Sequence, residues 1–173
     1  MDFLALFLVL AAIVLILAGT VRTGVPPMPT SPAVRACMFS LIGDLEPRCI
    51  HELGAGWGGL AGALARRYPD ARVVATEVSP LPWAVCRLRQ ALFGPANLDV
   101  RFGDVMKTDF SEADLAVCFL CPPAMARLAP RLEGGLKSGA HVLSNAFALP
   151  GWAPVKEARV DDLHRSAVYL YRK

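Results

Sequence analysis

The sequence predicts an α/β fold in which one N-terminal transmembrane helix precedes a doubly wound, mostly parallel sheet that ends in an antiparallel hairpin. Three observations lead to this prediction. An uninterrupted apolar run lies near the amino terminus. Short β-branched runs then alternate with longer helical runs, which is typical of βαβ units and a parallel sheet. The chain ends with two strand-like runs that follow each other without a helix between them, which is typical of antiparallel edge strands.

The apolar residues are unevenly distributed along the chain. Its 173 residues are 54% hydrophobic and 19% charged, and the mean hydropathy is +0.42. Much of this excess lies in residues 3–21, where only Gly19 and Thr20 are not apolar. The remaining residues, about 150, have the composition of an ordinary globular domain. The composition therefore excludes intrinsic disorder, a disulfide scaffold and a polytopic transporter.

The apolar run has the length of a membrane span. It covers 19 residues from Phe3 to Val21, and a helix of that length is ~28 Å long, close to the thickness of a bilayer core. A cleaved signal peptide would have a positively charged start and a shorter apolar region, but only Met1 and Asp2 precede this run. We therefore predict an uncleaved anchor over 1–22, followed by a proline-rich linker over 23–32.

Charge and cysteine content predict where the rest of the chain lies. Arg22 and Arg35 follow the apolar run and no Lys or Arg precedes it, so the positive-inside rule places a domain over 33–173 in the cytoplasm. Five cysteines, with no disulfide-like spacing, fit a reducing compartment. Cys118 and Cys121 form a CxxC within a predicted strand, where residues three apart face opposite sides, so we predict no metal. The net charge of +3, with no basic run, predicts no nucleic-acid partner.

Local patterns then give the helices and strands in order. Ser31 is a predicted N-cap, and Pro32 begins a helix that runs to about Leu41. Runs rich in apolar and β-branched residues predict strands over 48–53, 71–77, 98–102, 114–120 and 140–147. Longer runs between them predict helices over 58–67, 81–92 and 125–136.

The carboxyl-terminal part breaks this alternation. The chain between Phe147 and Val155 is too short for a crossover helix. Residues 154–160 and 166–172 are strand-like and are joined by a short turn region around Asp161. They predict a hairpin that adds two antiparallel strands to the edge of the sheet.

Residues 51–59, with the sequence HELGAGWGG, follow a predicted strand and open a predicted helix. Glycines there let the backbone turn tightly and approach a ligand closely, and the helix start offers free N–H groups. Gly54, Gly56 and Gly59 satisfy the GxGxxG pattern of dinucleotide-binding proteins. Gly54, Gly56 and Gly58 satisfy the tighter GxGxG of S-adenosylmethionine enzymes. A turn that binds nothing is the weaker interpretation, because closely spaced glycines destabilise a helix start.

Three features favour S-adenosylmethionine over a dinucleotide. Glu52 places a carboxylate just before the loop, where it suits the amino group of the methionine part and would repel a pyrophosphate. Asp104, after the third strand, is placed to accept a hydrogen bond from an adenine amino group, and the hairpin at the carboxyl end suits the seven-stranded fold of S-adenosylmethionine enzymes. Glu77, at the end of the second strand, would bind ribose hydroxyls with either cofactor. The predicted cofactor-binding residues are Glu52, Gly54, Ala55, Gly56, Gly58, Glu77 and Asp104.

With these motifs the chain resembles the class I, seven-β-strand S-adenosylmethionine-dependent methyltransferases. More narrowly, it resembles the protein-lysine methyltransferases that include a broad-specificity archaeal enzyme and mitochondrial enzymes acting on the adenine nucleotide translocase and the ATP synthase c subunit. The resemblance covers residues 25–172 and is most specific at 26–30, 77–83, 119–122, 139–144 and 168–171. It implies a Rossmann-like seven-stranded sheet and S-adenosylmethionine as cofactor. It also implies that the methyl acceptor is a lysine side chain of a protein, and membrane proteins are among the possible substrates.

The resemblance also implies roles for single residues. Glu52 and the loop backbone would face the methionine part of the cofactor, Glu77 the ribose and Asp104 the adenine. Candidates for the substrate pocket are Phe119, Pro122, Phe147 and Trp152. No catalytic residue is assigned, because an in-line attack by a neutral amine needs no covalent nucleophile.

The chain departs from the relatives in three places. Trp57 stands where they usually have Asp, Gly59 where they have Arg, and Pro27 where their linker, which is thought to fold over the active site, has an aromatic residue. Two rival functions therefore stay open beside lysine methylation. One is methylation of a membrane-associated small molecule such as a quinone or a lipid, and the other is a non-catalytic module that binds S-adenosylmethionine.

Overall fold

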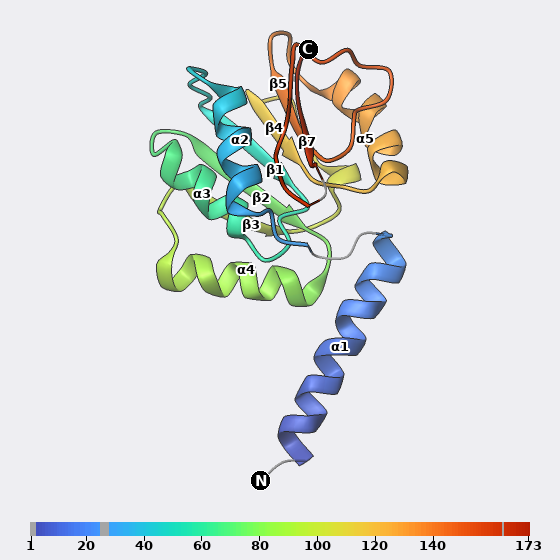
Figure 1. The fold of residues 1–173 in the computed structure, drawn as a ribbon. Coiled ribbons are helices and arrows are strands. Elements are labelled where there is room, and N and C mark those ends of the chain that lie inside the picture. Colours follow the sequence, from blue (N-terminus) through green and yellow to red (C-terminus); the bar gives the residue numbers. More distant parts are fainter. Residues whose placement is uncertain (1–2, 25–27, 164) are drawn as a thin grey trace.

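The computed structural model describes residues 3–24, 28–163 and 165–173, and it contains one seven-stranded sheet with the strand order β3-β2-β1-β4-β5-β7-β6 (Figure 1). The first five strands in the chain are parallel, and β7 runs antiparallel between β5 and β6. The strands are β1 (Cys49–Leu53), β2 (Arg72–Glu77), β3 (Leu98–Phe102), β4 (Leu115–Cys118), β5 (His141–Asn145), β6 (Lys156–Arg159) and β7 (Ala167–Arg172). The predicted α/β class, the parallel sheet and the terminal hairpin are confirmed. Pro27, where the chain departs from its relatives, lies outside the described residues.

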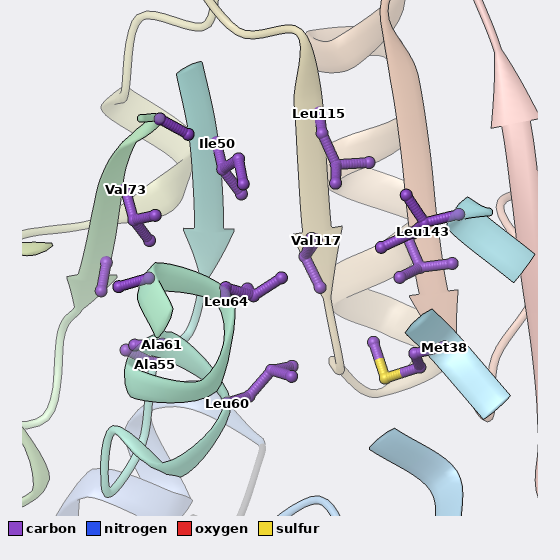
Figure 2. Close-up of a cluster of buried hydrophobic side chains, with 14 of the residues drawn as sticks. Met38, Ile50, Ala55, Leu60, Ala61, Leu64, Val73, Leu115, Val117 and Leu143 are labelled. Atoms are coloured by element: carbon purple, nitrogen blue, oxygen red, sulfur yellow. The ribbon is translucent and has the colours of Figure 1, made fainter. Parts of the chain in front are cut away.

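Helices cover both faces of the sheet. The helices that the structure describes are α1 (Phe3–Thr23), α2 (Pro32–Ile42), α3 (Gly59–Arg67), α4 (Pro80–Phe93), the 3₁₀ turn η1 (Val105–Lys107) and α5 (Pro122–Gly135), and of these α1 does not cover the sheet. One buried cluster joins α2 and α3 to the sheet, and Figure 2 shows Met38 of α2 and Leu64 of α3 directed toward the strands. A second cluster joins α5 to the opposite face, with Leu128 and Leu132 fully buried. This two-sided cover is the doubly wound arrangement expected from the sequence.

The predicted boundaries are close to the observed ones except at the end of β4. The strand assigned to 114–120 ends at Cys118, and α5 begins at Pro122 rather than at Met125. Two prolines cause the early helix start, because Pro122 and Pro123 occupy positions where the missing N–H costs no hydrogen bond. Cys121 is therefore the N-cap of α5 and not a strand residue, so the argument from opposite strand faces was wrong for this CxxC.

Helix α1 extends away from the sheet and lies against α4 (Figure 1). Its residues Phe3–Val21 are long and apolar enough to cross a membrane. Most of its large side chains are exposed, so it is not a core helix of the domain. A signal sequence meets the same criterion of length and composition, so the uncleaved anchor over 1–22 stays a prediction.

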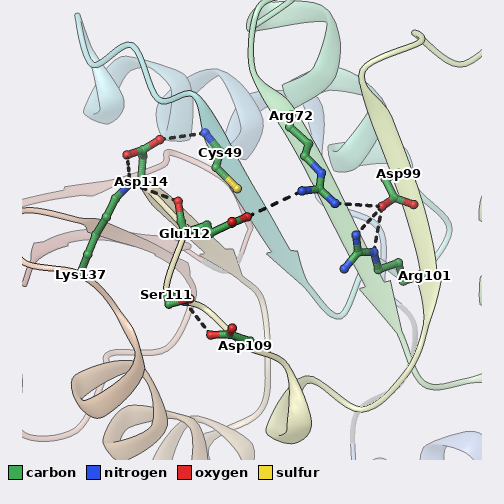
Figure 3. A network of polar contacts seen from close by, with 9 residues as sticks. All are labelled: Cys49, Arg72, Asp99, Arg101, Asp109, Ser111, Glu112, Asp114 and Lys137. Carbon is green, nitrogen blue, oxygen red and sulfur yellow. Dashed lines mark hydrogen bonds and ion pairs between the residues drawn. The ribbon is translucent and has the colours of Figure 1, made fainter.

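A polar network ties the amino ends of the strands together (Figure 3). Asp114 accepts hydrogen bonds from the backbone N–H groups of Arg48 and Cys49 at 2.9 and 2.8 Å, and its other oxygen lies 2.6 Å from Lys137 Nζ. Burial alone would raise the pKa of Asp114, but these hydrogen bonds outweigh it and the pKa is lowered. Arg72 extends the network to Asp99 by an ion pair of 3.8 Å. These contacts hold the amino ends of the strands together, and the cavity lies at the opposite, carboxyl ends of the strands.

Candidate functional site

A cavity of about 610 Å³ lies at the carboxyl ends of β1, β2 and β4. Ligands in open α/β sheets bind at this edge, near the point where the strand order reverses. The structure brings most of the predicted site residues together here: the lining includes Glu52, Gly54, Ala55, Gly56, Glu77, Asp104, Phe119 and Phe147. Among the described residues that line the cavity, the candidates Gly58, Pro122 and Trp152 do not appear.

The glycine loop leaves β1 in a conformation that requires glycine. Gly54, Gly56 and Gly58 have φ angles of +84°, +52° and +76°, a region that L-residues with a Cβ rarely adopt. The N–H groups of Gly54 and Ala55 both donate to the carbonyl of Thr76, at 2.9 and 3.0 Å. The loop is therefore fixed to the end of β2 before any ligand binds.

Gly58 has a packing role that the pattern alone does not reveal. It is the N-cap of α3, and a Cβ at this position would collide with the Sγ of Cys86 in α4. Burial raises the pKa of Cys86 to about 12, so this thiol stays protonated and acts as a small apolar group. The glycine therefore permits α3 and α4 to approach each other.

Glu77 holds the loop at the centre of the site. Its Oε2 accepts from the N–H of Gly56 at 2.8 Å, and its Oε1 accepts from the N–H of Ser79 at 2.7 Å. Each carboxylate oxygen retains a further lone pair. Glu77 can thus keep the loop and the start of α4 in place while it accepts a hydrogen bond from a ligand hydroxyl.

Within the described part of the chain, Glu52 is a buried carboxylate with one unpaired oxygen in the cavity. Its side chain is 4% exposed, and its Oε2 has no hydrogen-bond partner among the described residues. Burial first, and then the neighbouring Glu77, raise the pKa of Glu52 well above its usual value, although a hydrogen bond from the backbone of Ala61 opposes the shift. An ammonium group in the cavity would satisfy the orphaned oxygen and stabilise the ionised carboxylate. The chemistry of this end therefore fits the amino group of S-adenosylmethionine.

Asp104 also lines the cavity and lies two residues after the end of β3. It is the N-cap of η1, and its Oδ1 accepts from the N–H of Met106 at 2.9 Å. The adjacent Gly103 N–H donates to the Glu77 carbonyl at 3.0 Å, which ties this turn to the end of β2. The three predicted carboxylates thus all line the cavity, and each lies at or just after the end of a different strand.

The other end of the cavity is mainly apolar. Phe119 follows β4, and Phe147, 36% exposed, follows β5. Leu120 lies between the two ends, because its Cδ2 would be 2.9 Å from a Cβ on Gly54. Ala146 has a φ of +66°, and its N–H donates to the carbonyl of Ala167 at 2.7 Å. This uncommon conformation in a non-glycine residue turns the chain after β5 so that Phe147 reaches the cavity.

Two candidates for the substrate pocket have other places in the structure. Pro122 is the first residue of α5. Trp152 is half-buried and packs edge-on against Tyr171, with ring centroids 6.2 Å apart. Pro122 is exposed, and Trp152 packs against the buried cluster between α5 and the sheet.

Sequence reasoning missed several lining residues. Arg89 of α4 lines the cavity and donates to the carbonyl of Trp57 at 3.2 Å. Arg127 of α5 and Ser166, just before β7, also line it. No local pattern marks these positions, because each reaches the cavity only through the packing of its element. Linker residues 28–30 line the cavity as well, which agrees with a linker that folds over the site.

Comparison with known proteins connects this geometry to a family. The family model described as the ANTKMT methyltransferase domain matches residues 52–156. A protein-lysine N-methyltransferase of Saccharolobus islandicus (strain REY15A) is 29% identical over 157 residues, which are 85% of this chain and 92% of that protein. The match to the family begins at Glu52 and includes the glycine loop and the ends of the five parallel strands.

Solved structures give the same fold. An RNA methyltransferase from Salinibacter ruber, in complex with S-adenosyl-L-homocysteine, is 30% identical, covers 84% of this chain and 93% of its own, and superposes with a TM-score of 0.75. A precorrin-6y C5,15-methyltransferase from Geobacter metallireducens is 16% identical, with a TM-score of 0.65 over 84% of this chain and 91% of its own. At that identity the second likeness shows the fold alone.

Proposed function

Because this chain belongs to the ANTKMT methyltransferase domain family and is an S-adenosylmethionine-dependent methyltransferase, we propose that it is a membrane-anchored enzyme that methylates lysine side chains of a protein. The observation that carries the proposal is the cavity with two unlike ends, one with buried carboxylates and one apolar. The similarity to a protein-lysine N-methyltransferase over 85% of the chain supports the choice of acceptor.

The carboxylate end is proposed to bind the cofactor. S-adenosylmethionine, when bound, supplies an electrophilic methyl group on its sulfonium. Glu52 Oε2 would accept from the cofactor's amino group, Glu77 from the ribose hydroxyls and Asp104 from the adenine amino group. The start of α3 adds the positive end of a helix dipole at the same place. These residues bind and orient, and none needs to change its covalent state.

The apolar end is proposed to hold the acceptor lysine. A lysine in water has a pKa of ~10.4 and is charged at neutral pH, but burial in an apolar site favours the neutral amine that can attack a methyl group. Phe119 and Phe147 would exclude water and align this amine. Cys118, at the end of β4, is no competing nucleophile, because burial raises the pKa of its thiol to about 12.

The membrane part of the proposal divides the chain at residues 1–22, 23–32 and 33–173. It is supported by the exposed apolar helix over Phe3–Val21 and by the short connection from α1 to the cavity, which Met28–Thr30 line. A domain held in the cytoplasm by this anchor would reach acceptors on or near a membrane. The anchor would thus restrict the choice of substrate without contributing to the chemistry.

RNA is a second candidate acceptor, favoured by one observation. The Salinibacter ruber enzyme that is 30% identical is described as an RNA methyltransferase, and Arg89 and Arg127 place positive charge in the cavity lining. The net charge of +3, with no basic run in the sequence, argues for a protein acceptor.

The test is to incubate the full chain in detergent with methyl-labelled S-adenosylmethionine and a cell extract, and then to separate protein, RNA and lipid. We expect label in a protein fraction that is sensitive to protease and resistant to ribonuclease. Ribonuclease-sensitive label would select RNA, and label in the organic extract would select a lipid or quinone. The Glu77→Ala variant is the inactive control, and Glu112→Gln, whose carboxylate side chain is 77% exposed, is the matched active control.

A further inference from the structure

We propose that α4 lies in the membrane interface, with its outer face in the boundary between lipid headgroups and acyl chains. This inference rests on the proposed membrane anchoring by α1. Four observations support it: an apolar stripe on α4, two arginines that border the stripe, the contact between α1 and α4, and the position of that contact along α1.

The outer face of α4 is a continuous apolar stripe. At about 100° per residue, six side chains fall within one sector of about 120°, and they are Leu81, Ala84, Val85, Leu88, Ala91 and Leu92. Leu88 is 58% exposed and Leu92 is 60% exposed, whereas Leu81 and Val85 near the start of the helix are half-buried. The opposite face places Pro82 and Cys86 in the core. Exposed leucines in successive turns are unusual on a helix that contacts only water.

Two arginines border the stripe, one on each side. Arg87 and Arg89 lie about 100° to either side of Leu88 around the helix axis. Both are exposed, and residues 80–93 contain no acidic residue. An amphipathic helix with leucines on one face and flanking arginines suits an anionic membrane surface, because long basic side chains keep their charge at the phosphates while their stems cover apolar surface. This charge pattern favours a lipid surface over the buried contact of a protein dimer.

The contact with α1 gives the depth of α4 in the bilayer. A Cβ on Gly19 of α1 would lie 3.3 Å from the Oγ of Ser79, which is the N-cap of α4. Gly19 lies two residues before Val21, the end of the candidate span, which is about 3 Å along a helix. The first turn of α4 is thus level with the end of the apolar run, where interfacial helices bury their apolar face by about 5–10 Å. Figure 1 shows α1 leaving the domain on the side of α4.

This placement has a consequence for the substrate. Ser79, the N-cap of α4, and Arg89 within α4 also line the cavity. With α4 against lipid, one rim of the cavity lies at the membrane surface. Because residues 28–30, which follow the anchor, also line the cavity, the acceptor class is then a lysine in a segment next to the bilayer, rather than one on a distant soluble domain.

The test uses the full chain in nanodiscs of phosphatidylcholine and phosphatidylglycerol that contain a phospholipid with a photoreactive diazirine in its acyl chain. After photolysis and digestion, mass spectrometry maps the lipid adducts. We expect adducts on α1 and on residues 80–93, about tenfold more frequent than on α5, whose surface lies away from the proposed interface. Adducts on α1 without adducts on 80–93 would overturn the inference. Adducts on neither segment would overturn the anchoring and the inference together.

A variant and a control make the test specific. Leu88→Ser with Leu92→Ser should lower the adducts on 80–93 several-fold and leave those on α1 and the affinity for S-adenosylmethionine unchanged. Leu163→Ser removes a side chain that is 94% exposed elsewhere on the domain and should change nothing. A dimer in light scattering that the Leu88→Ser, Leu92→Ser variant abolishes, without lipid adducts on 80–93, would assign the face to a second copy instead. Photolabelling needs no methyl transfer, so its result is independent of which acceptor the enzyme uses.

Discussion

At one end of the cavity, the buried carboxylates of Glu52 and Glu77 and the backbone of a glycine loop line the ligand space, whereas at the other end Phe119 and Phe147 do. The first end comes from strands β1 to β3 and the turns that follow them. The second is assembled from the ends of β4 and β5, the linker and the segment before β7. One end is polar and fixed by hydrogen bonds, and the other is apolar and partly exposed. The polar end, where we propose that the cofactor binds, is therefore the more constrained part of the cavity.

The largest change in cofactor affinity is expected from Glu77→Ala, at the polar end of the cavity. Removing the carboxylate leaves the N–H groups of Gly56 and Ser79 without their acceptor and removes the proposed ribose contact. Affinity for S-adenosylmethionine should fall about 100-fold, equal to about 3 kcal/mol, as measured by calorimetry. Glu112→Gln should bind like the wild type. An unchanged affinity in Glu77→Ala would show that the cofactor lies elsewhere.

A second large effect is expected for stability from Gly58→Ala. The new Cβ would meet Cys86 at a φ of +76°, so the free energy of unfolding should fall by about 2–3 kcal/mol. Gly59→Ala is the matched control, because no atom lies within 4 Å of its added Cβ, and it should be neutral or slightly stabilising. Equal losses in urea unfolding of the two variants would contradict the packing role of Gly58.

Glu52→Gln removes the negative charge of this side chain but keeps its size, so it tests the contribution of the charge to cofactor binding. Because burial raises the pKa of Glu52 in the free protein and an ammonium partner favours its ionised form, affinity for S-adenosylmethionine should rise with pH through that raised pKa. Glu52→Gln should lose this pH dependence and bind about tenfold more weakly at the upper end of the range. Titration calorimetry at a series of pH values measures both.

The same variant should affect stability in the opposite direction. A folded-state pKa above the unfolded value means that Glu52 contributes stability below the unfolded pKa and loses it as pH rises through the folded pKa. Without cofactor at neutral pH, Glu52→Gln should therefore melt at a temperature roughly 2–4 °C higher than the wild type. A lower melting temperature would mean that the carboxylate has a cationic partner in the free protein.

The smallest effect is expected at the apolar end. Phe147→Ala should slow methyl transfer about fivefold and leave the affinity for S-adenosylmethionine unchanged, because Phe147 is 36% exposed and follows β5, which β4 separates from the strands that carry or precede the carboxylates. Trp152→Ala is the contrasting variant. Its ring packs on Tyr171, so it should lower the melting temperature before it changes transfer. If Phe147→Ala weakened cofactor binding as much as Glu52→Gln, the division of the cavity into two ends would be wrong.

The sequence predicted best those parts of the structure that depend on residues close together in the chain. The strand, glycine loop and helix over residues 49–67 are contiguous, so their order and conformation follow from residue type, and the hairpin followed from a connection too short for a helix. Arg89 and Ser166 could not be found in this way, because they reach the cavity through the packing of α4 and of the segment before β7. The contact between Gly58 and Cys86 joins residues of two different helical segments. No pattern in the sequence indicates which side chain will pack against a given glycine.

The most direct test of the central claim is to identify the methylated group. The full chain would be incubated with labelled S-adenosylmethionine and a membrane-containing extract, and the labelled protein hydrolysed to amino acids. The account predicts that the label elutes with methylated lysine, is absent with Glu77→Ala and is reduced with Phe147→Ala. Label on nucleosides, on lipid or on an amino acid other than lysine would contradict it.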